Sequence, residues 1–343
     1  MLRAGNDLQQ CAVGNETIHL APLLCISRNV IGAILFNQMP FDREVTLMFT
    51  FITSVRHPAT SLSYARIEAL LNRTLRSVCN QTNGNFRVIV VCNQLPTNPV
   101  ADDRISYLIS AEPPIETDDK LLRVRIDKGT KLALGLAAAR DYSPQHIMFF
   151  DADDFVHCGI VDYSETHRTD FGWYVERGFV YDQRTGLISP IRQFNEICGT
   201  SHIVSYGLVE PRGILPTSSR TQILNTLGED YVALILGAHP FLVRYFAKRG
   251  NTLSPLPFNG AVYVRGTGEN DRRYFTAPGF PRPPSRRFCR NFGISLSLMN
   301  QCRACVTWPR AVAEHVGHAV TGGVEMLDSA RRESDLQRVL RIP

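Results

Sequence analysis

Three carboxylates within four residues are the part of this 343-residue sequence with the clearest capacity for chemistry. The segment Asp151-Ala152-Asp153-Asp154 follows directly after the apolar run 146–150. Like charges this close repel one another in a partly buried site, and a divalent cation removes that cost. Hard oxygen ligands suit Mg²⁺ or Mn²⁺, which bind a few carboxylates together with substrate phosphates. The segment therefore predicts a metal site, and the alternative is a solvated acidic turn that caps the next element.

A second carboxylate pair, Glu229-Asp230, opens a helical pattern. Acidic residues are common in a first helical turn, because they interact favourably with the positive end of the helix dipole. A carboxylate that is not engaged by a metal can also accept a proton from a reacting hydroxyl group. The pair is thus a candidate general base, with a purely structural role as the alternative.

Two lysines, Lys128 and Lys131, flank Gly129 just before the Ala/Leu-rich segment 131–140. If that segment is a helix, the lysines and the helix N-terminal amides can hold a diphosphate together. A solvated loop is the other interpretation.

The elements that must position these residues begin with a βαβ pattern. The apolar and β-branched runs 45–53 and 86–91 predict strands buried on both faces. Between them, the segment 61–78 has the apolar spacing of a helix. Strand, helix and strand within 50 residues indicate a parallel pair.

The pattern then repeats up to the acidic segment. Residues 121–126 are strand-like, 131–140 form an expected helix, and 146–150 form a further apolar strand. The carboxylates would then lie at the C-terminal end of a parallel strand, where open α/β sheets bind their ligands.

The rest of the chain divides less clearly. We expect a hairpin from 171–181 and 186–191, a helix over 229–249 that Pro240 kinks or splits, and a last strand at 261–264. This gives one catalytic α/β domain over residues 45–270. A lead-in, residues 1–44, comes before this domain, and a translation start placed too far upstream would explain it. After the domain comes a C-terminal extension, residues 271–343, which is rich in Arg and Pro and then weakly helical.

Composition narrows the class of protein. A 44% apolar content supports one large core, and the net charge of +5 is modest. The nine cysteines show no framework spacing, and no secretory signal is visible, so a cytoplasmic location is expected. The arginines gathered in 272–290 can meet acidic lipid, which leaves peripheral contact with the cytoplasmic membrane face open. No nucleic-acid module is recognisable, so nucleic acid is not an expected partner.

Taken in order, these segments resemble the family 2 glycosyltransferases of the GT-A fold, whose Rossmann-like, mostly parallel sheet is flanked by helices. Any one segment alone is a weak signal, but the four occur in the family's order and with roughly its spacing. The segments that carry the resemblance are 71–91, 127–154, 198–204 and 228–231.

The resemblance implies an inverting transfer of a sugar from a nucleoside diphosphate sugar, with a UDP-sugar favoured, to a hydroxyl acceptor. The acceptor would be a glycan, a lipid-linked molecule or a small molecule. Asp153 would be the principal ligand of Mn²⁺ or Mg²⁺, and Asp151 would contact the metal or the ribose, with Ala152 between them beside the donor. Asp230 would be the base, supported by Glu229.

The resemblance also implies which residues would lie beside the two substrates. Thr53 would lie beside the nucleotide base, and Lys128 and Lys131 would belong to the donor segment. Gly199 and Thr200 would lie on the acceptor side.

The chain departs from the family pattern in three places. The second strand ends in 91–93, Val-Cys-Asn, where acidic residues are usual. The segment 265–270 lacks the histidine that many members use as a metal ligand, and Glu269 or Asn270 would have to substitute. The Gln-x-x-Arg-Trp signature of processive members is absent, so single additions are expected.

Three other functions remain open. A sugar-phosphate nucleotidyltransferase would carry a glycine-rich loop after the first strand, and 53–58 has no glycine. A haloacid dehalogenase-type phosphatase would place its aspartates on the first strand. A catalytically inactive GT-A-like binding protein is the third.

Overall fold

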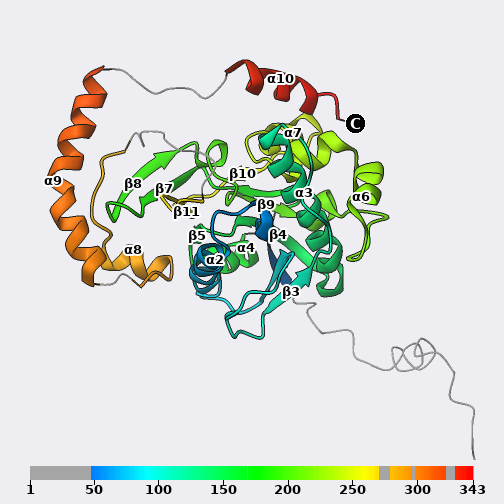
Figure 1. The fold of residues 1–343 in the computed structure, drawn as a ribbon, viewed down its shortest axis with the longest axis horizontal. Helices are drawn as coiled ribbons and strands as arrows, with labels where there is room; N and C mark the ends of the chain where they lie inside the picture. Colours follow the sequence, from blue (N-terminus) through cyan, green and yellow to red (C-terminus); the bar gives the residue numbers. More distant parts are fainter. Residues whose placement is uncertain (1–47, 168, 270–278, 296–297, 322–328, 343) are drawn as a thin grey trace, which may run out of the picture. The chain divides into compact units, whose positions relative to one another are not determined.

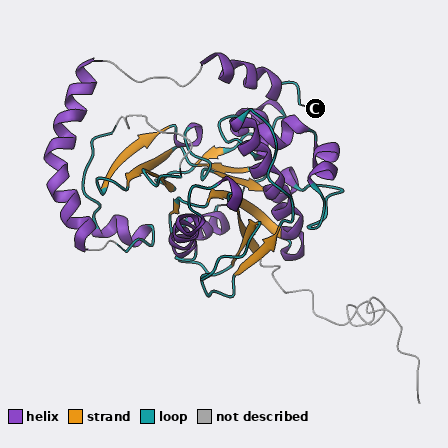
Figure 2. Cartoon of the chain, viewed as in Figure 1, coloured by secondary structure: helices purple, strands orange, loops and turns teal. Residues whose placement is uncertain are grey.

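The computed structural model describes residues 48–342 except 168, 270–278, 296–297 and 322–328. All of the described elements belong to the unit Thr46–Pro343. This unit contains both strands and helices, as Figures 1 and 2 show, and its last three elements are helices. Its main sheet has seven strands in the order β10-β6-β9-β4-β1-β2-β3.

Four neighbouring strands of this sheet are parallel: β1 (Met48–Ser54), β2 (Phe86–Cys92), β3 (Ile105–Ile109) and β4 (Pro144–Asp151). α2 (Tyr64–Val78) makes the connection from β1 to β2. The apolar runs of β1, β2 and β4 are buried on both faces, as expected for central strands with helices on either side. The predicted α/β class with a mostly parallel sheet is confirmed.

The prediction of a strand at 121–126 is wrong. These residues belong to α3 (Lys120–Ala139), which begins at the N-cap Asp119, whose Oδ1 accepts from the amides of Leu121 and Leu122 at 3.0 and 3.1 Å. A short apolar run fits both a strand and a buried helix, and the cap decided between them. The strand that fills this place in the order is β3, a short apolar run of four partly buried residues and one exposed residue that the sequence analysis did not predict as a strand.

The other strands complete two sheets. β9 (His202–Ser205) runs antiparallel between β4 and β6 (Gly172–Tyr174), and β10 (Ser254–Pro255) pairs with β6. A second sheet has the order β5-β11-β7-β8 and contains the predicted last strand and hairpin. The first hairpin strand is shorter than predicted, because residues 172–174 of the expected strand 171–181 form β6 in the main sheet. Its strands are β5 (Phe155–Val156), β7 (Arg177–Asp182), β8 (Leu187–Arg192) and β11 (Ala261–Arg265).

One face of the main sheet packs against α3 and a second layer of helices. This layer includes α6 (Arg220–Leu227), the π-helical segment η5 (Tyr231–Leu236) and α7 (Leu242–Lys248). The break between η5 and α7 contains Pro240, which confirms the predicted split. Gly129 of α3 lets η5 approach at backbone distance, because a Cβ there would lie 2.0 Å from the carbonyl oxygen of Val232.

The opposite face packs against α2 and α4 (Ile160–Thr166). Phe51 is fully buried at its centre, with edge-to-face contacts to Phe86 and Phe150 at centroid distances of 5.6 and 6.3 Å. The shorter elements are η2 (Pro58–Thr60), η3 (Arg140–Tyr142), η4 (Phe194–Glu196) and α5 (Tyr206–Val209).

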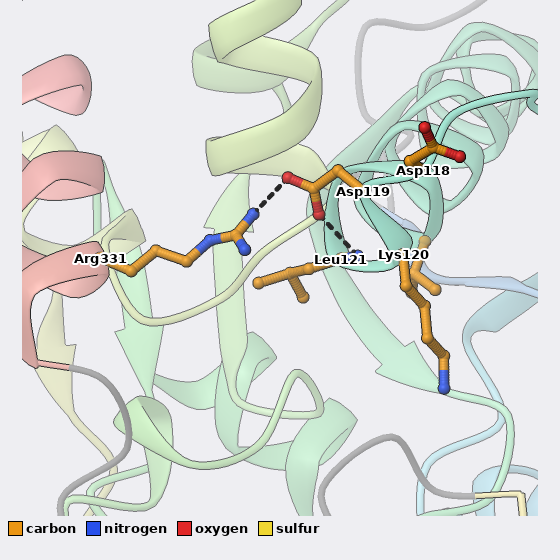
Figure 3. Close-up of a pocket in the computed structure, with 6 residues that line it drawn as sticks. Asp118, Asp119, Lys120, Leu121 and Arg331 are labelled. Carbon is orange, nitrogen blue, oxygen red and sulfur yellow. Dashed lines mark hydrogen bonds and ion pairs between the residues drawn. The ribbon is translucent and has the colours of Figure 1, made fainter.

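The C-terminal extension contains α8 (Arg286–Asn291), α9 (Leu298–Thr321) and α10 (Ser329–Val339). α10 is tied to the first turns of α3 by the ion pairs Arg331–Asp119 and Arg125–Asp335, at 2.7 and 2.6 Å. A cavity of about 500 Å³ lies at this junction, and Figure 3 shows Arg331 reaching across it to Asp119. None of the predicted site residues lines it. Among the described helices, none is both long and apolar enough to cross a bilayer.

Candidate active site

The acidic segment lies where the sequence analysis placed it. Asp151 is the last residue of β4, and in the register of the sheet it pairs with Ser54, the last residue of β1. The backbone then turns, with the amide of Asp154 donating to the carbonyl of Asp151 at 3.2 Å. The turn therefore occupies the carboxyl edge of the parallel strands, the usual ligand-binding edge of an open α/β sheet.

Lys128 is the cation closest to the end of β4. Its ammonium group donates to Oδ1 of Asp151. Burial disfavours the charged ammonium, but the charge and hydrogen bond of Asp151, together with the nearby Asp154 and Cys198, outweigh this, and the pKa of Lys128 is raised. Because Lys128 is in the interior of α3, the predicted contribution of helix N-terminal amides at this position is wrong.

Asp153 is in a different electrostatic environment. Burial and then the charge of Asp151 raise the pKa of Asp153 to about 7, against the opposing charges of Arg56 and Lys128. The two carboxylates therefore resist simultaneous ionisation, as expected of a site that gains from a further positive charge. Sequence reasoning did not single out Arg56, which follows β1 by two residues.

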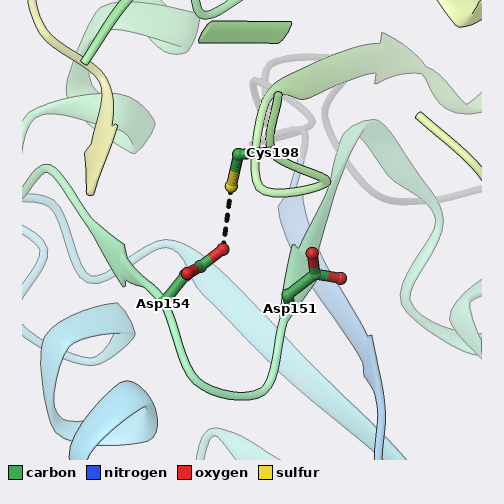
Figure 4. A group of neighbouring side chains, drawn as sticks. All are labelled: Asp151, Asp154 and Cys198. Carbon is green, nitrogen blue, oxygen red and sulfur yellow. Dashed lines mark hydrogen bonds between the residues drawn. The ribbon is translucent and has the colours of Figure 1, made fainter. Parts of the chain in front are cut away.

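Asp154 points away from this edge into the protein. It is fully buried and accepts three hydrogen bonds: from the Cys198 thiol at 2.8 Å, the Thr200 hydroxyl at 2.6 Å and the Val264 amide at 3.0 Å. Figure 4 shows the Cys198 contact and, across the turn, the side chain of Asp151. Burial raises the pKa of both Asp154 and Cys198, so the thiol stays protonated and able to donate.

Asp151, Asp154 and Cys198 have ligand atoms within 4.8 Å of one another and could hold a metal ion by distance alone. However, both oxygens of Asp154 already accept hydrogen bonds. A protonated thiol is also a poor ligand for the hard cations Mg²⁺ and Mn²⁺. Asp151 and Asp153 fit such a cation better, because both are partly exposed and repel each other.

Gly199 and Thr200 lie against the same turn. A Cβ at Gly199 would be 2.6 Å from Oδ2 of Asp151 and 2.8 Å from Nζ of Lys128. The Thr200 side chain is fully buried, and its hydroxyl accepts from the Asp151 amide at 2.9 Å. These two residues, predicted on the acceptor side, therefore lie directly behind the first carboxylate.

Two residues predicted to contact the donor are buried. Lys131 donates to the carbonyl of Val55 at 2.8 Å and to Asp127 at 2.7 Å. Burial lowers its pKa, although the charge of Asp127 opposes this. Thr53 is fully buried in β1, and its hydroxyl makes no hydrogen bond to any described residue. Both side chains lie beneath the edge of the sheet, and Lys131 holds the main chain there through its bond to the Val55 carbonyl.

The pair Glu229-Asp230 begins the helical turn that continues into η5, as predicted. Glu229 is exposed, and the carboxylate of Asp230 accepts a hydrogen bond from Arg338 of α10. η5 also contacts α3 at Gly129, the residue next to Lys128. Asp230 therefore begins the segment that packs on α3 beside Lys128, and it is bonded to the C-terminal extension.

Glu269, a suggested replacement for the missing histidine, is already engaged. Its carboxylate accepts from the amides of Leu62 and Ser63 at 3.3 and 2.9 Å and pairs with Arg56 at 3.4 Å. It therefore fastens the segment after β11 to the loop after β1. Asn270, the other suggestion, lies outside the described residues.

No protein-family model matches the chain, and no curated protein matches its sequence. Among solved structures, S. aureus TarS 1-349 aligns with a TM-score of 0.31 and 12% sequence identity. The alignment covers 64% of this chain and 60% of that chain. The α/β class stated above follows from the order and direction of the strands.

Proposed function

We propose that this chain is a metal-dependent glycosyltransferase that uses a nucleoside diphosphate sugar. The observation that carries the proposal is the charge arrangement at the carboxyl edge of the sheet. Two partly exposed carboxylates, Asp151 and Asp153, lie there under the influence of two cations, Lys128 and Arg56. Carboxylates that share a divalent cation, with basic side chains beside them, suit a diphosphate better than a neutral ligand.

In this proposal Asp151 and Asp153 hold Mn²⁺ or Mg²⁺, which when bound neutralises charge on the leaving diphosphate. Lys128 pairs with Asp151 and adds a positive charge beside it. Arg56 adds a second positive charge from the loop after β1, where its ion pair with Glu269 orients it. Ala152 and the end of β1, backed by Thr53 and Lys131, form the floor of the donor site, and a UDP-sugar is the favoured donor.

Asp230 is the proposed base, with Glu229 beside it. Removal of the acceptor proton by a carboxylate as the new bond forms is consistent with inversion at the sugar carbon. Arg338 donates to Oδ1 of Asp230, so in this arrangement Oδ2 is the oxygen that would accept the proton. The acceptor is a hydroxyl group on a glycan, a lipid-linked molecule or a small molecule, extended by one sugar at a time.

The test is a donor screen. The full chain is incubated with individual nucleotide sugars, Mn²⁺ and a panel of hydroxyl acceptors, and release of nucleoside diphosphate is measured. We expect release that stops in EDTA and in Asp153→Ala. Release of pyrophosphate from a nucleoside triphosphate and a sugar phosphate would instead identify a nucleotidyltransferase. Metal-dependent nucleotide binding with no turnover on any donor would favour a binding protein.

A further inference from the structure

The side chain of Asp154 is turned away from the carboxylates that would bind the donor, and it is fully buried and accepts three hydrogen bonds. Burying a carboxylate is costly unless donors satisfy it. Here three donors do so, and they come from two segments remote in sequence, the turn 198–200 and β11. A carboxylate with this many hydrogen bonds fixes the positions of the segments that bond to it.

Thr200 connects this buried carboxylate to the functional edge. Its hydroxyl donates to Oδ2 of Asp154 at 2.6 Å and accepts from the amide of Asp151 at 2.9 Å. The amide of Asp154 in turn donates to the carbonyl of Asp151 at 3.2 Å. The acidic turn is therefore closed twice, once through its own backbone and once through the Thr200 hydroxyl.

The same contacts press the turn 198–200 against Asp151. Cys198 and Thr200 are both bonded to Asp154, so the residue between them cannot move independently. That residue is Gly199, whose Cα faces the Asp151 carboxylate and the Lys128 ammonium. Together with the bond from the Asp151 amide to the Thr200 hydroxyl, these two bonds hold this wall behind the Asp151–Lys128 pair.

From this geometry we propose that Asp154 and Thr200 are positioning residues for the metal-binding carboxylates. Through the Thr200 hydroxyl, Asp154 fixes the main chain of Asp151 and the wall at Gly199, and so sets the direction of the Asp151 carboxylate. The inference rests on the proposed function, because it assigns Asp151 to the metal. It also places Thr200 on the donor side of the site.

The experiment measures Mn²⁺ binding by electron paramagnetic resonance in the presence of UDP, at a temperature where every variant is folded by circular dichroism. Thr200→Ser keeps a hydroxyl that can donate and accept, and should bind Mn²⁺ as tightly as wild type. Thr200→Val keeps the shape but removes both bonds, and should bind about 10-fold more weakly or worse, the scale of an unsatisfied buried partner. Asp154→Asn should show a loss of similar size.

Thr74→Val is the matched control. Thr74 is also fully buried, and its hydroxyl has no hydrogen-bond partner among the described residues, so its loss should leave Mn²⁺ binding unchanged. If Thr200→Val does not fold, Cys198→Ala removes only one of the three donors to Asp154 and should weaken binding by about threefold. Asp153→Ala identifies the bound Mn²⁺ as that of this site.

The outcomes separate the two proposals. If Thr200→Val and Asp154→Asn bind Mn²⁺ as tightly as the wild-type protein does, the positioning role is overturned and the proposed function still stands. Equal losses in Thr200→Val and Thr200→Ser would also overturn it, since the hydroxyl would not be the cause. No Mn²⁺ binding by the wild-type protein would overturn both.

Discussion

Replacing Gly199 by alanine should damage the site while leaving the fold nearly intact. The added Cβ would lie 2.6 Å from Oδ2 of Asp151 and 2.8 Å from Nζ of Lys128, where ordinary contact begins at 3.4 Å. The carboxylate therefore has to retreat by about 0.8 Å and the ammonium by about 0.6 Å. Both are the ends of side chains, so the fold can adapt at small cost, but a misplacement approaching 1 Å at a reacting centre can lower turnover by about 100-fold.

The assay compares nucleoside diphosphate release with thermal unfolding for three variants. Gly199→Ala should lose about 10- to 100-fold in turnover with little change in Tm. Gly84→Ala, where an added Cβ meets nothing within 4 Å, should match wild type in both measurements. Gly129→Ala should mainly destabilise the fold, because its Cβ would lie 2.0 Å from the backbone oxygen of Val232. If Gly199→Ala kept full turnover, the close approach of this turn to Asp151 would have no functional meaning.

Four further predictions address the metal, pH, the base and the tail. UDP should raise Tm only with Mn²⁺ or Mg²⁺, and Asp153→Ala should abolish this rise; equal stabilisation in excess EDTA would contradict a metal-bridged site. Because the pKa of Asp153 is raised to about 7, ionising this carboxyl destabilises the folded protein, so the free energy of unfolding without metal should fall from about pH 4 to 7. The affinity for Mn²⁺ should instead rise through pH 7, since the proton leaves the carboxylate. A Mn²⁺ affinity that stays constant from about pH 6 to 8 would count against this environment of Asp153. Asp230→Asn should lower turnover by about 100-fold and leave the affinity for nucleotide unchanged. Arg338→Ala, which removes the contact to Asp230, should maintain or increase turnover. If Asp230→Asn turned over as fast as wild type, another group would have to be the base, and Glu229 would be the first to test. If the arginines of 272–290 attract anionic lipid, the protein should co-sediment with acidic vesicles and be released by salt, and retention on neutral vesicles would argue against this.

The sequence alone determined the α/β class and the location of the acidic turn. Strands buried on both faces appear as continuous apolar runs, and β1, β2 and β4 are such runs. Once their parallel pairing is expected, the residues after β4 must lie at the carboxyl edge of the sheet. The split at Pro240 was predictable for a similar reason, since proline acts on the helix that contains it.

Only the tertiary structure decided which acidic side chains are partly exposed and which partners each of them has. Asp154 is 44, 46 and 110 residues away from its donors Cys198, Thr200 and Val264. Arg338 is 108 residues from Asp230. Such pairings depend on how segments pack after the chain has folded, and no local pattern encodes them. The extent of α3 was missed because a short apolar run fits either periodicity until its cap is known, and this also hid the fact that Lys128 reaches Asp151 from the middle of a helix.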